Sequence, residues 1–247
     1  MRNRIFSLDS PKAIKARGYG YLNAIHYMAP ASLAGVGNLC PKATESCKAL
    51  CLGWYSGQAA MVKGENINTV RQSRIDKARR FMLSRAEYMA DVVRSIELAQ
   101  KLARRKRLKL CVRLNGSTDI AWEGISCERG GKHFRNLMEA FPDIQFVDYT
   151  KIASRLSRDL PPNYHLTLSR TEKNESDARK ALELQKTIAV VFRGGLPKLY
   201  LGAPVVNGDL HDLIHLHPPG VVIGLTPKGS KAKRDRSGFV VDTGVAA

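Results

Sequence analysis

Three of the five cysteines lie within twelve residues, at positions 40, 47 and 51. Thiolates bind soft metals and iron–sulfur clusters well. Structural zinc usually takes four ligands, commonly as two close pairs, and no second pair of cysteines follows this segment. We therefore expect Cys40, Cys47 and Cys51 to hold a four-iron cluster with one iron open to a substrate or cofactor. Zinc, or no metal at all, is the alternative, and Cys127 could supply a fourth ligand.

A second group of chemically active residues follows a series of short apolar runs. The candidate acid/base groups are Asp119 and Glu123. Lys151 is a candidate catalytic residue whose positive charge would bind an anion. Ser117 and Asp119 would also suit helix N-caps, which is a purely structural role. The residues expected to bind the substrate are Asn115, Ser117, Ser169, Arg170, Asn174, Arg193, Asp209 and Lys228. The pocket they would form is net positive, which suits a phosphate, a carboxylate or a nucleotide.

The elements that would position these residues alternate between strand and helix. Apolar runs cover residues 108–114, 144–149, 164–168, 188–192 and 221–225, and helical stretches cover 133–141, 152–158 and 176–186. This order is typical of a parallel sheet covered by helices, which binds ligands at the carboxyl ends of its strands. We expect an α/β fold: a partial (β/α) barrel or a mostly parallel sheet with flanking helices, preceded by an irregular Cys-containing N-terminal segment.

The chain is expected to form a single domain over residues 1–247, with four parts. The parts are the irregular Cys-containing segment 1–64, a helical region 65–107 of two helices or one kinked helix, a βα-repeating core 108–228 and a basic tail 229–247. Within the core, short apolar pairs at 199–201 and 205–206 predict a hairpin-like insertion. Asn207-Gly208 is its expected turn.

The charge balance points to an anionic partner. The chain has 40 Lys and Arg against 22 Asp and Glu, a formal net charge of +18. Such an excess favours nucleic acid, DNA or RNA, or a nucleotide, because cations neutralise phosphates and release counterions. A basic protein without a specific partner is the alternative. The sequence leaves the oligomeric state open.

The apolar segments predict no association with a membrane. No run of about 20 apolar residues is present, and the basic start Met1-Arg2-Asn3-Arg4 is followed by an apolar stretch too short for a signal peptide. The odd number of cysteines favours thiolate or metal roles over disulfides. We therefore expect a cytoplasmic protein.

Three histidines, His211, His215 and His217, form the other candidate metal cluster. A His-hydrophobic-His triplet of this kind holds the metal in rolling-circle nucleases and relaxases, which use a tyrosine nucleophile. Here the triplet precedes Pro218-Pro219, in an expected loop. A surface loop with incidental histidines is the favoured interpretation, and a metal-dependent nuclease is an alternative function.

Several longer motifs resemble one family. They are Leu39-Cys40-Pro41-x-Ala43-Thr44-x2-Cys47-x3-Cys51, Arg113-Leu114-Asn115-Gly116-Ser117-x-Asp119, Tyr149-Thr150-Lys151, Leu168-Ser169-Arg170 and Gly224-Leu225-x-Pro227-Lys228-Gly229. Together they resemble the "gene product eighty-eight" domain family of phages and plasmids, over most of the chain after residue 20. The resemblance implies a mobile element in the cytoplasm of a bacterial host cell, and it implies no particular reaction.

The layout is more distantly similar to radical S-adenosylmethionine enzymes. That resemblance implies a partial α/β barrel with three cysteines near its mouth, a four-iron cluster and S-adenosylmethionine at the open iron. The cysteine spacing C-x6-C-x3-C differs from the C-x3-C-x2-C usual in those enzymes. The resulting hypothesis is an iron–sulfur enzyme of a mobile element that acts on nucleic acid or a nucleotide-like anion. A non-catalytic nucleic-acid-binding protein with a structural metal site is the alternative.

Overall fold

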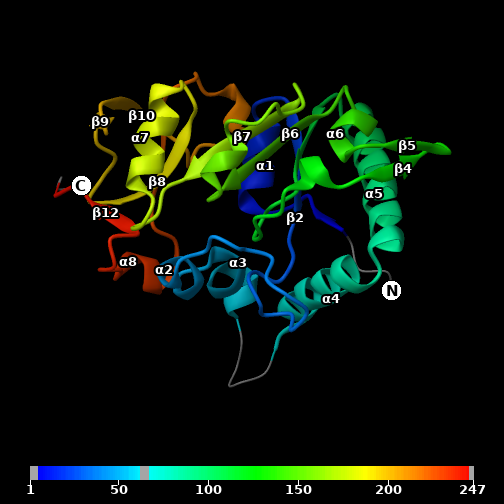
Figure 1. Ribbon diagram of the computed structural model, residues 1–247, viewed down its shortest axis with the longest axis horizontal. Coiled ribbons are helices and arrows are strands. Elements are labelled where there is room, and N and C mark those ends of the chain that lie inside the picture. The colour runs from blue at the N-terminus through cyan, green and yellow to red at the C-terminus, as the bar shows by residue number, and fades with distance from the viewer. Residues whose placement is uncertain (1–4, 62–66, 245–247) are drawn as a thin grey trace.

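The computed structural model describes residues 5–61 and 67–244 and shows a mostly parallel sheet flanked by helices (Figure 1). Among the described residues the sheet has ten strands in the order β1-β2-β3-β6-β7-β8-β11-β10-β9, and β12 pairs with β8. The pairs β1–β2 and β9–β10 are antiparallel, and the other pairs are parallel. The strands are β1 (Phe6–Ser7), β2 (Tyr21–His26), β3 (Lys109–Arg113), β6 (Gln145–Thr150), β7 (Tyr164–Ser169), β8 (Ile188–Arg193), β9 (Leu199–Tyr200), β10 (Ala203–Asn207), β11 (Val222–Leu225) and β12 (Val240–Asp242).

The expected mostly parallel sheet is confirmed. Because β1 and β9 stand at opposite ends of the strand order, the described strands show no closure into a barrel. The strands expected after residue 107 agree with β3, β6, β7, β8 and β11 to within one residue at each end. Their near-continuous apolar pattern made them recognisable, because parallel strands covered on both faces bury successive side chains.

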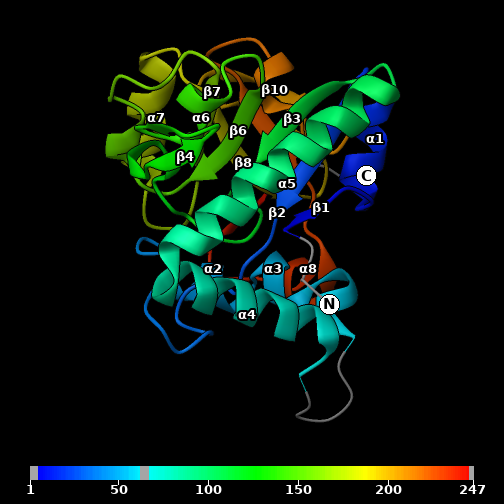
Figure 2. The same cartoon turned by 90° about the vertical axis from the view of Figure 1, so that its right-hand side faces the viewer.

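Two long helices follow residue 68. Helix α4 (Thr69–Leu83) and helix α5 (Arg85–Arg105) are separated at Ser84, whose φ of −137° is not helical, so the expected helical region is two helices. Its expected start at residue 65 lies outside the described residues, as do residues 1–4 and 245–247. Figure 2 shows α5 lying across one face of the sheet. In the described part of the chain, no helix is long and apolar enough to cross a membrane.

The opposite face of the sheet is covered by helix α1 (Pro11–Arg17) and by the segment around the short helix η4 (Ile214–Leu216). Ala16 of α1 packs in one apolar cluster with Cys111 and Val147 of the sheet. Cys111 is fully buried there, which fits a small buried hydrophobe.

The N-terminal segment is more regular than expected. Residues 21–26 form β2, which pairs in parallel with β3. The strand pattern is broken by Asn23 and His26, two fully buried polar residues. The ring of His26 is satisfied by the Tyr88 hydroxyl, 2.6 Å from Nε2, and by the Leu114 carbonyl, 3.1 Å from Nδ1. The expectation of an irregular segment is therefore wrong for β2, and also for α1, α2 (Glu45–Ala49), α3 (Leu52–Tyr55) and η1 (Gly57–Ala60).

Two of the three helical stretches expected in the core are much shorter than predicted. Residues 133–141 contain the end of a hairpin, β4 (Cys127–Arg129) with β5 (Lys132–Phe134), and only a short α6 (Leu137–Ala140). Residues 152–158 contain the 3-10 turn η3 (Ala153–Arg155). The third stretch is confirmed as α7 (Glu175–Glu183).

The expected hairpin near residue 200 is present as β9 and β10, but its turn differs. The chain turns at Leu201 and Gly202, which both have positive φ, whereas Asn207 ends β10. The tail also differs from expectation: it contains helix α8 (Gly229–Lys233) and strand β12, which extends the sheet beside β8.

Candidate functional site

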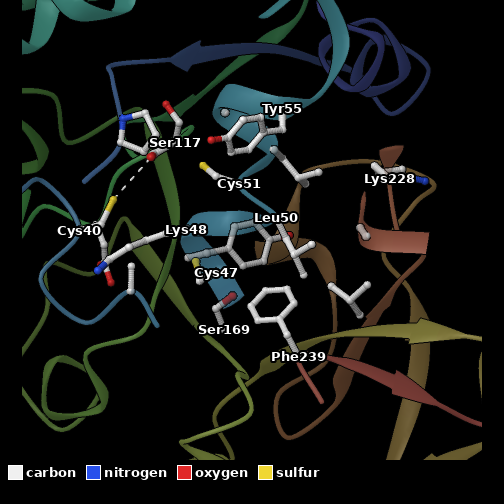
Figure 3. Close-up of a pocket in the computed structure, with 18 of the residues that line it drawn as sticks. Cys40, Cys47, Lys48, Leu50, Cys51, Tyr55, Ser117, Ser169, Lys228 and Phe239 are labelled. Atoms are coloured by element: carbon white, nitrogen blue, oxygen red, sulfur yellow. Dashed lines mark hydrogen bonds between the residues drawn. The ribbon is translucent and has the colours of Figure 1, made fainter. Parts of the chain in front are cut away.

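A cavity of about 660 Å³ lies between the carboxyl ends of the parallel strands and helices α2 and α3 (Figure 3). Parallel α/β sheets bind ligands at this edge. One wall comes from the strand ends and the loops that follow them, and the other from the N-terminal segment. The predicted site residues that line the cavity are Cys40, Cys47, Cys51, Asn115, Ser117, Asp119, Lys151, Ser169, Asp209 and Lys228.

The three cysteines reach the cavity from one short stretch of chain. Cys47 lies in α2, which begins where the Thr44 hydroxyl accepts a hydrogen bond from the Cys47 amide at 3.1 Å. Cys51 is the N-cap residue of α3. The Cys40 thiol donates to the Ser117 carbonyl at 3.7 Å, which ties the cysteine loop to the loop after β3. All three thiols are free and partly exposed.

The protonation and the grouping of the three thiols decide which metal group they could hold. Burial raises the pKa of the Cys40 thiol to about 11 and also raises that of Cys51, so a bound metal or a nearby cation is needed to keep them as thiolates. In residues 5–61 and 67–244, no three His, Cys, Asp or Glu side chains are grouped so as to hold one metal ion. A multi-iron cluster accepts ligands that stand wider apart than a zinc ion does. The three thiols line one cavity without being grouped around a single ion site, and the expected cluster stays a prediction.

Cys127 does not belong to this group. It is buried in β4, which packs beside α5, and it does not line the cavity. A role as fourth ligand is therefore not supported by its position.

Asn115 organises the loop after β3. Its Oδ1 accepts hydrogen bonds from the Thr118 hydroxyl and the Ile120 amide, both at 2.9 Å. Its Nδ2 donates to the Ile120 carbonyl and to Asp148, at 2.9 and 3.2 Å. Because these bonds occupy the amide, they give Asn115 a role in holding the loop, and its predicted contact with a substrate stays a prediction.

Asp119 and Glu123 share a buried arginine that the sequence did not mark as functional. Arg155, with 1 % of its side chain exposed, donates to Asp119 at 3.0 Å and to Glu123 at 2.9 and 2.7 Å. Asp119 also accepts the Lys151 amide at 2.8 Å. Both carboxylates are thus ion-paired, and Glu123 does not line the cavity. Their acid/base roles remain predictions, and no local pattern distinguishes Arg155 within the expected helix 152–158.

Lys151 lies close to the cysteines. Burial alone would lower the pKa of its ammonium group, but Cys47, Asp119 and Cys40 outweigh burial and raise it. A side-chain hydrogen bond with Cys47 also raises the pKa of Lys151. A cation held here offsets the negative charge of thiolates, whether free or bound to a metal.

Three residues expected to bind substrate lie outside the cavity lining. Arg170 and Arg193 contact the C-terminal segment, and Asn174 contacts the loop after β7. Arg170 donates to the Gly238 carbonyl, and Arg193 pairs with Asp242 at 2.7 Å. The Asn174 Oδ1 accepts a hydrogen bond from the Thr171 amide at 2.6 Å, and its Nδ2 donates one to the Ser169 carbonyl at 3.1 Å. These contacts give the three residues a structural role, because they join β7 and β8 to the neighbouring loops and to β12. Their predicted contact with a substrate stays a prediction.

The histidine cluster lies at the opposite edge of the sheet. His215 packs against Tyr21, at the amino end of β2, with ring centroids 5.2 Å apart. His211 and His217 stack on each other at 5.0 Å. In the described residues these histidines do not form a group that could hold a metal ion, so their arrangement does not favour the nuclease alternative.

Fold and site together define an open, mostly parallel α/β protein with a cysteine-lined cavity at the carboxyl edge of its sheet. Residues 5–243 match the family described as Gene product 88, and the chain belongs to that family. The expected family is therefore confirmed. No curated protein and no solved structure matches the chain.

Proposed function

We propose that the cavity is the active site of an iron–sulfur enzyme encoded by a mobile element. Cys40, Cys47 and Cys51 would hold a four-iron cluster, and the strand-end residues would bind a nucleotide-like anion. The observation that supports this proposal most strongly is that the three thiols share one cavity with the carboxyl ends of the parallel strands. When bound, such a cluster supplies one-electron chemistry at its open iron, and the distant radical-enzyme resemblance points to S-adenosylmethionine as the cofactor there.

The charges around the cavity support an anionic substrate. The lining includes five cations, Lys12, Lys48, Arg113, Lys151 and Lys228, and three carboxylates, Glu45, Asp119 and Asp209. In this arrangement Lys151 stabilises the negative charge beside the cysteines. Lys228 also lines the cavity, but its charge is balanced by Asp209 at 3.1 Å.

The proposal is tested by anaerobic purification followed by iron and sulfide analysis and an ultraviolet–visible spectrum. We expect a brown protein with equal amounts of iron and sulfide, on the order of four per chain. The combined variant Cys40→Ala, Cys47→Ala, Cys51→Ala should lose both the colour and the iron, because it loses all three proposed ligands.

The matched control is Cys127→Ala, which removes a buried thiol that does not line the cavity. It should keep the wild-type iron content and spectrum. A colourless wild-type protein that takes up no cluster on anaerobic reconstitution would refute the proposal. Equal iron loss in Cys127→Ala and in the triple variant would refute the ligand assignment.

A further inference from the structure

The C-terminal rim of the cavity carries a row of exposed cations. Lys231, Lys233 and Arg234 are exposed on α8 and directly after it, while Ala232 is buried and lines the cavity. The buried Ala232 places α8 at the rim, and Figure 2 shows α8 beside α3. A Cβ atom on Gly229 of α8 would lie 3.6 Å from the Tyr55 carbonyl oxygen of α3. We call the three cations Lys231, Lys233 and Arg234 the α8 strip.

In the described part of the chain, no carboxylate forms an ion pair with the α8 strip. The cations next to it in sequence differ, because Lys228 pairs with Asp209 at 3.1 Å and Arg236 lies 3.6 Å from Asp242. Three like charges so close together repel one another and gain from an anion that binds across them. The phosphates of a nucleic-acid backbone are anions that could bind to several such cations at once.

An aromatic ring lies between the α8 strip and the cavity. Tyr55 of α3 lines the cavity and is 37 % exposed. The Lys231 ammonium lies over the ring, 3.7 Å from its centroid, and the Arg71 guanidinium lies over it at 5.8 Å. A base that stacks on the face covered by Lys231 would take the place of that ammonium group. Figure 3 shows Tyr55 and Phe239 at the same cavity. An exposed ring beside cations is the combination that proteins use to stack the bases of single strands.

We propose that the α8 strip binds the backbone of a single-stranded nucleic acid while Tyr55 stacks one base, so that a neighbouring nucleotide enters the cavity. A cavity of about 660 Å³ has the size of a site for one small ligand, and chemistry on a base requires it to leave the duplex or to come from a single strand. This inference deepens the proposed function and rests on it for the chemistry inside the cavity. A free nucleotide would occupy the cavity without needing three more cations outside it.

The test measures fluorescence anisotropy of labelled oligothymidylate and oligouridylate, each of about fifteen nucleotides, over a range of salt concentrations. We expect the combined variant K231Q/K233Q/R234Q to weaken binding by roughly tenfold or more. The slope of log K against log salt should become shallower by about 2, because each lost phosphate contact on a single strand contributes about 0.7.

The matched control is R104Q/R105Q/K106Q, which removes three exposed cations near the C-terminal end of α5. Those cations precede β3 and therefore lie at the amino edge of the sheet, away from the cavity. This variant should change the affinity by less than about threefold. The variant Tyr55→Leu should weaken binding by roughly tenfold with an unchanged salt slope, because it removes stacking without removing a cation.

Equal losses in the α8 and α5 variants would overturn the inference, since they would indicate binding by overall charge alone. So would a mononucleotide that binds as tightly as the oligonucleotides. Binding is also measured with the Cys40→Ala, Cys47→Ala, Cys51→Ala protein, after circular dichroism shows that it is folded. If the wild-type protein binds the oligonucleotides but holds no cluster, only the iron–sulfur proposal is refuted. If the protein holds a cluster but does not bind the oligonucleotides, only this inference is refuted.

Discussion

At the scale of single residues, Arg155 shows how the cavity wall is held together. It is buried and pairs with two carboxylates, Asp119 and Glu123, and its Nη2 also donates to the Tyr164 hydroxyl at 3.0 Å. Tyr164 in turn donates to Asp148 at 3.0 Å, which accepts the Asn115 amide at 2.6 Å. This network connects the loops after β3 and β6, the two loops that bring Asp119 and Lys151 to the cavity.

Replacing Arg155 by methionine should reduce the free energy of unfolding by about 3–5 kcal/mol, because Asp119 and Glu123 would remain buried without their partner. Urea unfolding followed by circular dichroism measures this change. The matched control is Arg135→Met, which breaks the exposed pair with Glu139 and should cost at most about 1 kcal/mol. A cost for Arg155→Met as small as that of the control would contradict the role assigned to the network.

At the scale of elements, the position of α3 decides whether the cysteines face the strand ends. A Cβ atom on Gly53 would lie 2.3 Å from the Cβ of Ser117, so α3 can approach the loop after β3 only with glycine there. The Ser117 hydroxyl also donates to the Met28 carbonyl at 2.6 Å, which holds the segment after β2 against the same loop. Cys51, two residues before Gly53, depends on this contact for its place at the cavity.

The variant Gly53→Ala should therefore push α3 away from the loop after β3. We expect a loss of stability of about 1–3 kcal/mol and a lower iron content after anaerobic reconstitution, measured by urea unfolding and iron analysis. The double variant Gly53→Ala, Ser117→Gly removes the opposing Cβ atom and should recover most of the iron content. If Ser117→Gly brings no recovery, close packing at this contact is not what positions Cys51.

At the scale of the whole molecule, the two edges of the sheet differ in chemistry. The carboxyl edge holds the cavity with its cysteines and cations, and the amino edge holds the histidine cluster. Burial lowers the pKa of His215 to about 4, with a smaller contribution from repulsion by His165, His211, His217 and Lys109. His165 is likewise lowered to about 4, mainly by burial.

This difference predicts a loss of stability in mild acid. Between pH 6.5 and 4 the unfolded chain binds protons that the folded His26, His165 and His215 do not, because burial lowers the pKa of all three. Folded Asp148, whose pKa burial raises to about 7, binds one proton in the same range and acts in the opposite direction. The three histidines outweigh it, so the free energy of unfolding falls as the pH decreases through that range. Urea unfolding at a series of pH values measures the slope, and His215→Gln should make it shallower. An identical slope in His215→Gln would contradict the prediction.

Much of the sheet could be predicted from the sequence, because the burial of its central strands is visible as local apolar runs. The same reasoning missed β2, since buried Asn23 and His26 interrupt its apolar pattern, and the His26 ring is satisfied only by distant partners such as Tyr88. It also extended the helices near residues 133 and 152 too far. Gly130 and Gly131, which turn the β4–β5 hairpin with positive φ, precede the first of these stretches.

The candidate site could be predicted only in part. Cys40, Cys47, Cys51, Ser117 and Lys151 all line the cavity, because strand order places the carboxyl ends together and the cysteines lie close in sequence. Arg170, Asn174 and Arg193 follow strands in the same way but are used to hold neighbouring backbone and β12. Which polar residue faces a cavity and which secures a loop depends on partners far away in the chain.

The sequence by itself determined the family, the parallel strands and the close spacing of the three cysteines, because these are properties of contiguous residues. Only the tertiary structure decided that the cysteines face the strand ends, since that depends on long-range packing of α3 against the loop after β3. The contact between Cys40 and the Ser117 carbonyl, 77 residues apart, is one such interaction. The pairing of Arg155 with Asp119 and Glu123 is another, and neither leaves a periodic pattern in the sequence.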